Sequence, residues 1–274
     1  MIRNLNFRIL WYTLLILQAM ENTDLVKKIT HSILLKNYFK FLIVFLFLIP
    51  LSYAENIETK EKALVSKIID AYGGKKQLAK VASISAEGRV KDFFSVDEGI
   101  YFRYMKRERK LFVDIKYFRS TEKRILDGDK GYRGTEEKVT EVKGPPYDAM
   151  VYQYNQLNLP YGLVDGAFKV TYLRKENIGN TDAEILKLED KYGHDIEVYL
   201  SPKDFLIYKV IGYFKMGKAK TSLSAEFTDF RKVEGILLPF KIINYADALK
   251  ISETYIVKYT INPKIDDSAY FAVP

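Results

Sequence analysis

The chain has 274 residues, of which 48% are hydrophobic, and this is enough for a packed core in one or two domains. It contains no Cys, which excludes disulfides, thiolate metal sites, a cysteine nucleophile and lipidation of an N-terminal Cys. Its two His, His31 and His194, lie far apart in the sequence, so a histidine-rich metal site and a serine–histidine triad both lack support.

The formal net charge of +8 arises partly at the N-terminus. Residues 1–54 contain six of the 43 Lys and Arg but only two of the 35 Asp and Glu, so residues 55–274 carry a net charge of +4. This mildly basic balance is compatible with anionic membrane surfaces and gives no argument for binding nucleic acid.

The N-terminal segment has the features of an export signal. Lys36 and Lys40 precede an apolar run over 41–49, and Ser52 and Ala54 place small residues at the −3 and −1 positions of a cleavage site. We therefore expect residues 1–54 to be a signal segment that is cleaved after Ala54, and residues 55–274 to form one exported domain.

Two alternatives remain open in this segment. The run over 41–49 can instead be an uncleaved anchor, which also places the domain outside the cytoplasm. A second apolar patch, Ile9–Leu17, lies ahead of that run, so Met20 rather than Met1 can be the true start.

Helical spacing occurs at the start and in the middle of the mature chain. Apolar residues in Glu58–Tyr72 recur at helical intervals until Gly73 and Gly74, and a short helical turn is expected over Lys75–Lys80. The central stretch Gly144–Gly166 begins with two prolines that suit a helix start. We expect this stretch to be a helical lid on the concave face of a sheet; the alternative is a surface crossover between two β-meanders.

The remaining segments alternate apolar and polar residues with a period of two, which predicts antiparallel strands. The predicted strands are Ser83–Lys91, Gly99–Lys106, Lys110–Tyr117, Glu122–Leu126, Phe168–Lys175, Ala183–Asp190, Asp195–Leu200, Phe205–Phe214, Ser222–Arg231, Ile236–Tyr245 and Lys250–Ile261. The fold class is therefore α+β and mostly antiparallel β, a curved sheet or incomplete barrel of about ten or eleven strands closed by helices. Such sheets enclose apolar ligand cavities.

Two acidic pairs resemble functional sites but have simpler interpretations. Asp127 and Asp129 flank a glycine without the rest of a calcium loop, so we expect a turn there. Asp266 and Asp267 have no accompanying catalytic group, so we expect them to cap a loop. We predict no metal, no cofactor and no enzymatic activity.

Several short motifs, taken in order along the mature chain, resemble the periplasmic lipoprotein carriers, the LolA/LolB-like family of outer-membrane lipoprotein-sorting proteins. These motifs are Ala71-Tyr72-Gly73-Gly74, Ser85-Ala86-Glu87-Gly88, Lys106-Arg107 before Leu111-Phe112, Ile125-Leu126-Asp127-Gly128, Asn158 to Leu163, Val233 to Pro239 and Asp266 to Phe271. The resemblance implies an eleven-stranded half-barrel with a mid-chain helical lid over an apolar cavity. It also implies a periplasmic chaperone that receives the acyl chains of lipoproteins.

The resemblance and the strand alternation together suggest the ligand-contacting residues. We expect an apolar cavity surface on the early strands opposite a helical stripe on the lid; these residues are Phe102, Tyr104, Val113 and Ile115 on the strands, and Met150, Tyr154 and Leu157 on the lid. In the family's carriers, the arginine of a Lys-Arg-Pro stretch holds the lid closed. Arg107 is its counterpart here, although Glu108 replaces the proline, and the alternative is an exposed hairpin charge.

The leading hypothesis is a carrier of acylated lipoproteins or lipids that acts as a monomer and makes transient contact with inner- or outer-membrane sorting machinery. The alternative is a structural or regulatory cell-envelope domain of the same fold, whose cavity is filled by its own side chains. The sequence does not separate these two, because cavity lining and core both read as alternating apolar residues.

Overall fold

The computed structural model describes residues 60–178, 181–216 and 219–271. The expected signal segment, its apolar run over 41–49, the cleavage site after Ala54 and the alternative start at Met20 all lie outside the described residues. The described part begins with a helix over 60–71, which corresponds to the helix expected over Glu58–Tyr72.

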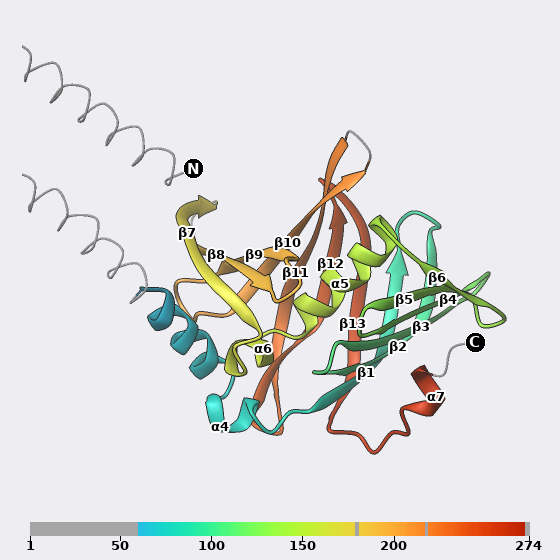
Figure 1. The fold of residues 1–274 in the computed structure, drawn as a ribbon, viewed down its shortest axis with the longest axis horizontal. Coiled ribbons are helices and arrows are strands. Elements are labelled where there is room, and N and C mark those ends of the chain that lie inside the picture. Colours follow the sequence, from blue (N-terminus) through green and yellow to red (C-terminus); the bar gives the residue numbers. More distant parts are fainter. Residues whose placement is uncertain (1–59, 179–180, 217–218, 272–274) are drawn as a thin grey trace, which may run out of the picture. The chain divides into compact units, whose positions relative to one another are not determined.

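One antiparallel sheet of thirteen strands makes up most of the described chain (Figure 1). The strands are β1 (Ser83–Asp92), β2 (Asp97–Lys106), β3 (Lys110–Tyr117), β4 (Thr121–Asp127), β5 (Lys130–Gly134), β6 (Val139–Val142), β7 (Phe168–Ile178), β8 (Thr181–Asp190), β9 (Asp195–Leu200), β10 (Ile207–Met216), β11 (Ala219–Val233), β12 (Ile236–Ala246) and β13 (Leu249–Ile261). Their order in the sheet is β6-β5-β4-β3-β2-β1-β13-β12-β11-β10-β9-β8-β7.

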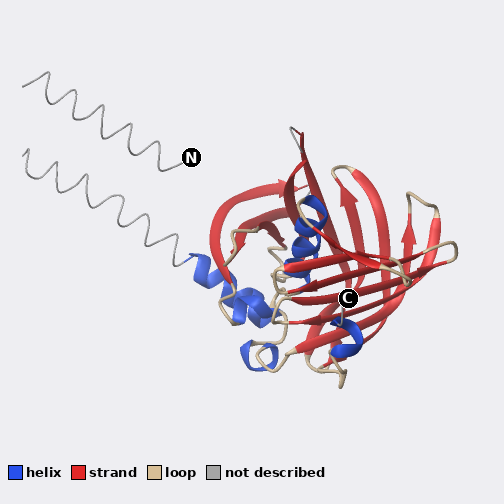
Figure 2. Cartoon of the chain, turned by 45° about the vertical axis from the view of Figure 1, so that its right-hand side comes forward, coloured by secondary structure: helices blue, strands red, loops and turns tan. Residues whose placement is uncertain are grey.

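This order consists of two meanders joined by the pairing of β1 with β13. The only chain segment between the meanders is the helical stretch that follows β6 and precedes β7, and those two strands form the edges of the sheet. The sheet is therefore open, and it curls around its concave face (Figure 2).

The number of strands differs from the prediction of ten or eleven. The added strands are β5 and β6, which are only five and four residues long. The expected turn at Asp127–Gly131 is the tip of the β4–β5 hairpin, where Asp127 pairs with Lys130 and Gly128 has a φ of 60°. Strands this short, one with two glycines and the other with only four residues, give too few periods of alternation to be recognised in the sequence.

The helices lie at the ends and in the middle of this arrangement. They are the helix over 60–71, α4 (Lys75–Leu78), α5 (Pro145–Leu157), α6 (Tyr161–Val164) and α7 (Ser268–Phe271). The first of them ends at residue 71; Gly73 follows with a φ of 122°, which suits glycine, and the N–H of Gly74 donates to the carbonyl of Ile69 at 2.9 Å. This cap turns the chain toward α4.

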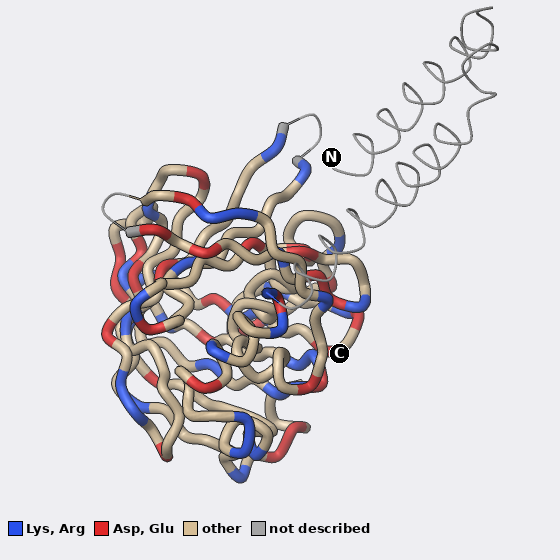
Figure 3. Tube along the Cα trace, turned by 90° about the vertical axis from the view of Figure 1, so that its left-hand side faces the viewer, with Lys and Arg blue, Asp and Glu red and all other residues tan. Residues whose placement is uncertain are grey.

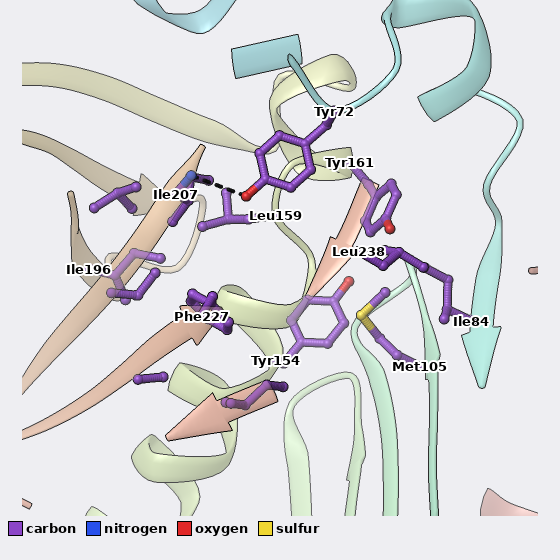
Figure 4. Close-up of a cluster of buried hydrophobic side chains, with 14 of the residues drawn as sticks. Tyr72, Ile84, Met105, Tyr154, Leu159, Tyr161, Ile196, Ile207, Phe227 and Leu238 are labelled. Carbon is purple, nitrogen blue, oxygen red and sulfur yellow. Dashed lines mark hydrogen bonds between the residues drawn. The ribbon is translucent and has the colours of Figure 1, made fainter. Parts of the chain in front are cut away.

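The main core lies on the concave face, where the inward side chains of both meanders meet the helix over 60–71, α5 and α6. In β12, every second residue from Ile236 to Ile242 is buried, as expected for a strand with one face in a core. Tyr72 joins the opening helix to the second meander, because its hydroxyl accepts the N–H of Ile207 at 3.1 Å (Figure 4).

A smaller cluster lies on the outer face of the first meander. Tyr104, Phe112 and Ile125 pack there against Phe271 of α7. Asp267 anchors this C-terminal segment by accepting from the Lys106 amine at 2.7 Å. The loop before α7 is capped as expected: Asp266 accepts from the backbone N–H of Ser268 at 3.0 Å.

The Glu253 carboxylate on β13 should make the free energy of unfolding depend on pH in the acid range. Its carboxylate pairs with Lys250 and accepts from the Tyr255 hydroxyl at 2.6 Å, and these contacts lower its pKa from near 4.5 to about 2. A lowered carboxylate pKa adds stability above the ordinary pKa, and that stability is lost as pH falls from about 4.5 to about 2. Glu253→Gln should lower the free energy of unfolding by about 1–2 kcal/mol at pH 7 after solvent screening.

The measurement is urea unfolding of the two proteins between pH 7 and pH 3. The difference between them should shrink steadily below about pH 4.5. A difference that stays constant over this range would show that the Glu253 carboxylate is not held ionised by its neighbours.

Candidate ligand cavity between the sheet and α5

The two proline residues that begin α5 occupy its first turn, where the missing N–H groups cost nothing. The helix then runs across the concave side of the sheet and contacts β4, β5, β9 and β10 (Figures 1 and 2). The Tyr152 hydroxyl donates to the carbonyl of Val210 at 3.2 Å. The ring of Tyr152 lies over Gly212, where a Cβ atom would come within 2.5 Å of it. The lack of a side chain at Gly212 therefore lets α5 approach β10 closely.

Tyr154 holds the other side of α5 to the β2–β3 turn. Its hydroxyl donates to the carbonyl of Arg107 and accepts the N–H of Arg109 at 3.0 Å. Burial raises the pKa of Tyr154 to about 12, so the phenol stays protonated and able to donate at neutral pH. α5 is thus attached to both meanders by hydrogen bonds from tyrosines.

A cavity of about 360 Å³ remains between α5 and the sheet. Its apolar lining comes from α5 and from inward residues of both meanders, and includes Met150, Tyr152, Leu157, Tyr101, Ile115 and Ile242. A second cavity of about 40 Å³ adjoins it and shares Arg103, Gln156, Leu157 and Ile242 with the first. Tyr161, Met105 and Leu238 lie around this smaller cavity (Figure 4).

The three α5 residues predicted to contact a ligand, Met150, Tyr154 and Leu157, have two different roles in the structure. Met150 and Leu157 line the larger cavity, and Leu157 lines the smaller one too. Tyr154 lines neither of these two cavities and instead holds the helix to the β2–β3 turn.

The expectation that Phe102, Tyr104, Val113 and Ile115 share one concave surface is wrong. Val113 and Ile115 lie in the main core, and Ile115 lines the larger cavity. Phe102 and Tyr104 lie in the outer cluster beside α7.

The cause is the register of the β2–β3 hairpin. Lys106 pairs with Lys110, so odd-numbered residues of β2 face odd-numbered residues of β3. Val113 therefore shares its face with Arg103, its cross-strand partner, and not with Tyr104. Arg103 lies in the middle of the inward face of β2, so the alternation of apolar residues does not reveal this register in the sequence.

The polar part of the lining was not predicted. Glu122 forms ion pairs with Arg124 at 3.3 Å and with Arg133 at 2.8 Å on one side of the larger cavity. Arg103 and Gln156 are 5% and 6% exposed and lie where the two cavities meet. The cavity is therefore amphipathic rather than purely apolar.

Arg107 lies in contact with the helical insert and is not an exposed hairpin charge. Its guanidinium donates to the carbonyl of Val81 at 3.0 Å and to that of Tyr161 at 3.2 Å, and it pairs with Asp165 just after α6. Its side chain is 15% exposed. Arg107 thus connects the β2–β3 turn with α6 and with the residue that follows it.

Basic and acidic residues are interspersed along the chain trace, in keeping with the mildly basic composition (Figure 3). Within residues 60–178, 181–216 and 219–271, no group of three or more His, Asp or Glu side chains is placed to hold a metal ion. Among the described helices, none combines the length and apolar character needed to cross a bilayer.

No protein-family model matches the sequence, and no curated protein matches it significantly. The structure, however, is similar to solved structures at low sequence identity. A LolA superfamily protein from Nitrosomonas europaea has 14% identity and a TM-score of 0.50, with 77% of this chain and 97% of that chain covered. A DUF1329 family protein from Desulfovibrio piger has 14% identity and a TM-score of 0.50, with 76% and 95% covered.

A third structure, a domain from Vibrio parahaemolyticus named for outer-membrane lipoprotein sorting, has 11% identity and a TM-score of 0.50. The alignment with this structure covers 76% of the present chain and 97% of the Vibrio chain. These similarities extend over nearly the whole described part of the chain. The chain therefore has the LolA-like fold that its sequence motifs indicated.

Proposed function

We propose that this protein is an exported periplasmic carrier that binds the acyl chains of lipoproteins or lipids between α5 and the concave face of the sheet. The observation that carries this proposal is the cavity of about 360 Å³ beneath α5, with its apolar lining from both meanders. The cavity adjoins a second space of about 40 Å³, so the concave face is only partly filled by the protein's own side chains.

The driving force for such binding is the removal of acyl chains from water. Each buried CH₂ group contributes roughly 0.8 kcal/mol, so burial of about ten methylenes supplies the roughly 8 kcal/mol of a micromolar complex, before the cost of association and without covalent chemistry. Met150 suits a surface that must adapt to acyl chains, because its unbranched side chain repacks easily. The proposed role is therefore that of a non-catalytic lipid-binding chaperone.

The expected export signal and the lipoprotein-sorting name of the Vibrio structure support a periplasmic location. In this proposal the protein carries an acylated lipoprotein or lipid as a monomer. It meets the inner- and outer-membrane sorting machinery only transiently, and α5 with α6 acts as the lid of a half-barrel.

Native mass spectrometry of the mature protein, purified from the periplasm of an expression host, tests this proposal. We expect a population with added mass that chloroform–methanol extraction identifies as acyl lipid. A matched control is the same protein after delipidation and incubation with lipid vesicles, which should regain the added mass. A protein that stays free of lipid in both experiments would favour the structural or regulatory alternative.

A further inference from the structure

A buried cation lies where the two cavities meet. Arg103 stands in the middle of β2 on the inward face, where it is 5% exposed. Its Nη1 atom has no hydrogen-bond partner among the described residues. The guanidinium lies 5.8 Å from the ring centroid of Tyr259 and also hydrogen-bonds to that side chain.

No carboxylate of the described residues pairs with Arg103. The two acidic residues that line the larger cavity are engaged elsewhere: Glu122 pairs with Arg124 and Arg133, and Asp92 accepts the backbone N–H of Phe94 at 2.7 Å. A buried charge without a counterion is strongly unfavourable, so buried charges are normally paired. Arg103 therefore offers a buried positive charge that an anionic group of a ligand could pair with.

Two other buried polar groups beside Arg103 also lack partners. The Tyr161 hydroxyl and the Gln156 Oε1 atom form no hydrogen bond with the part of the chain that the structure describes, and their residues are 1% and 6% exposed. Both residues line the smaller cavity together with Arg103. Tyr161 stays protonated because burial raises its pKa, so its hydroxyl can donate. The Gln156 amide can rotate so that its NH₂ group points into the smaller cavity, which Arg103 and Tyr161 also line.

We propose that Arg103, Tyr161 and Gln156 form a binding site for the carboxylate of a long-chain fatty acid or a similar carboxylate amphiphile, whose acyl chain occupies the larger cavity. This inference rests on the proposed carrier function and names its ligand class. A guanidinium presents a planar fork of donors that matches the two oxygens of a carboxylate. The Tyr161 hydroxyl and the Gln156 amide would supply two further hydrogen-bond donors to the carboxylate.

The size of the smaller cavity selects a small anionic group. A volume of about 40 Å³ holds only a few water-sized groups. A carboxylate fits this space, whereas a phosphodiester that carries a second substituent does not. Free phosphate-ended amphiphiles share the same anionic chemistry, so they must be distinguished by experiment.

The test is competition against an uncharged fluorescent acyl probe bound to the mature protein. The competitors are palmitate, 1-hexadecanol and hexadecyl phosphate, which have chains of the same length and different head groups. We expect palmitate to compete at least tenfold better than 1-hexadecanol, since a hydrogen bond to a charged group is lost with the alcohol. Hexadecyl phosphate should compete less well than palmitate; a reversed order would overturn the assignment to a carboxylate.

Arg103→Met removes the charge at nearly constant length. In this variant, palmitate and 1-hexadecanol should compete equally well, and the empty protein should unfold at a higher temperature than the wild type, because an unpaired buried charge is gone. The matched control is Arg174→Met on β7, a residue that lines neither cavity and pairs with Glu176 at 2.9 Å. This control should keep the preference for palmitate.

The outcomes separate this inference from the proposed function. If the wild type binds the probe but does not distinguish palmitate from 1-hexadecanol, the carboxylate site is refuted and the carrier function stands. If the wild type binds the probe but Arg103→Met retains the preference, Arg103 is refuted as its source. If the wild type binds neither probe nor competitor, the proposed carrier function itself fails.

Discussion

Leu157→Glu is expected to weaken binding of an uncharged fluorescent acyl probe by at least tenfold while leaving the fold intact. Leu157 lines both cavities, so the new carboxylate would enter the space in which an acyl chain must lie. Placing a charge against the chain removes several methylene contacts, each worth roughly 0.8 kcal/mol. Arg103 lines the same two cavities, and the new carboxylate can pair with it and occupy the proposed anion site.

Stability should change little in this variant. Leu157 is only partly buried, and its new charge has a cation nearby to pair with. The measurements are probe titration by fluorescence and urea unfolding by circular dichroism. Leu157→Ala is the matched control: it enlarges the cavity, should keep probe binding within about threefold, and should cost less than the 2–5 kcal/mol typical of a fully packed leucine.

The reverse pattern would contradict a ligand cavity. If the wild type takes up no probe and Leu157→Ala costs about 2–5 kcal/mol, then Leu157 belongs to a packed core. That result would favour a structural or regulatory role for the same fold.

Long strands with clear alternation were predictable, and short or polar ones were not. Strands such as β12 bury every second residue, so period-two alternation marks them in the sequence. β5 and β6 carry too few apolar residues for this signal, and the sequence pattern predicts no strand over them. Each strand's face was harder to predict than its existence, because the face depends on hairpin register.

The error on β2 shows this dependence. Aromatic residues at Phe102 and Tyr104 suggested a cavity wall, but α7 from the far end of the chain covers them. Because Lys106 pairs with Lys110, Arg103 pairs with Val113 and lies with it on the inward face. A buried arginine without a carboxylate partner violates the pattern that inward residues are apolar, and such violations tend to occur at functional sites. Sequence alternation alone therefore does not reveal Arg103, on which the proposed ligand class depends.

Arg107→Leu is expected to speed the release of a bound acyl probe by roughly tenfold. The guanidinium donates to carbonyl groups of Val81 and Tyr161 and pairs with Asp165, so it ties the β2–β3 turn to α6 and to the segment after α4. A hydrogen bond from a charged group is worth about 1.5–3 kcal/mol, and a barrier lowered by 1.4 kcal/mol raises a rate tenfold. In the proposed carrier, these contacts of Arg107 would keep the insert closed over the cavity.

The measurement is stopped-flow release of the probe into excess vesicles, with circular dichroism to show that the fold is retained. Asp165→Asn is the matched control, because Asp165 is 48% exposed and its removal leaves the carbonyl contacts of Arg107 in place. It should change the release rate by less than about threefold. Arg107→Lys keeps the charge but not the fork of donors, so its rate should lie between the wild type and Arg107→Leu. Release that is equally fast in all four proteins would mean that Arg107 only supports the turn, and that Tyr152 and Tyr154 alone hold the insert in place.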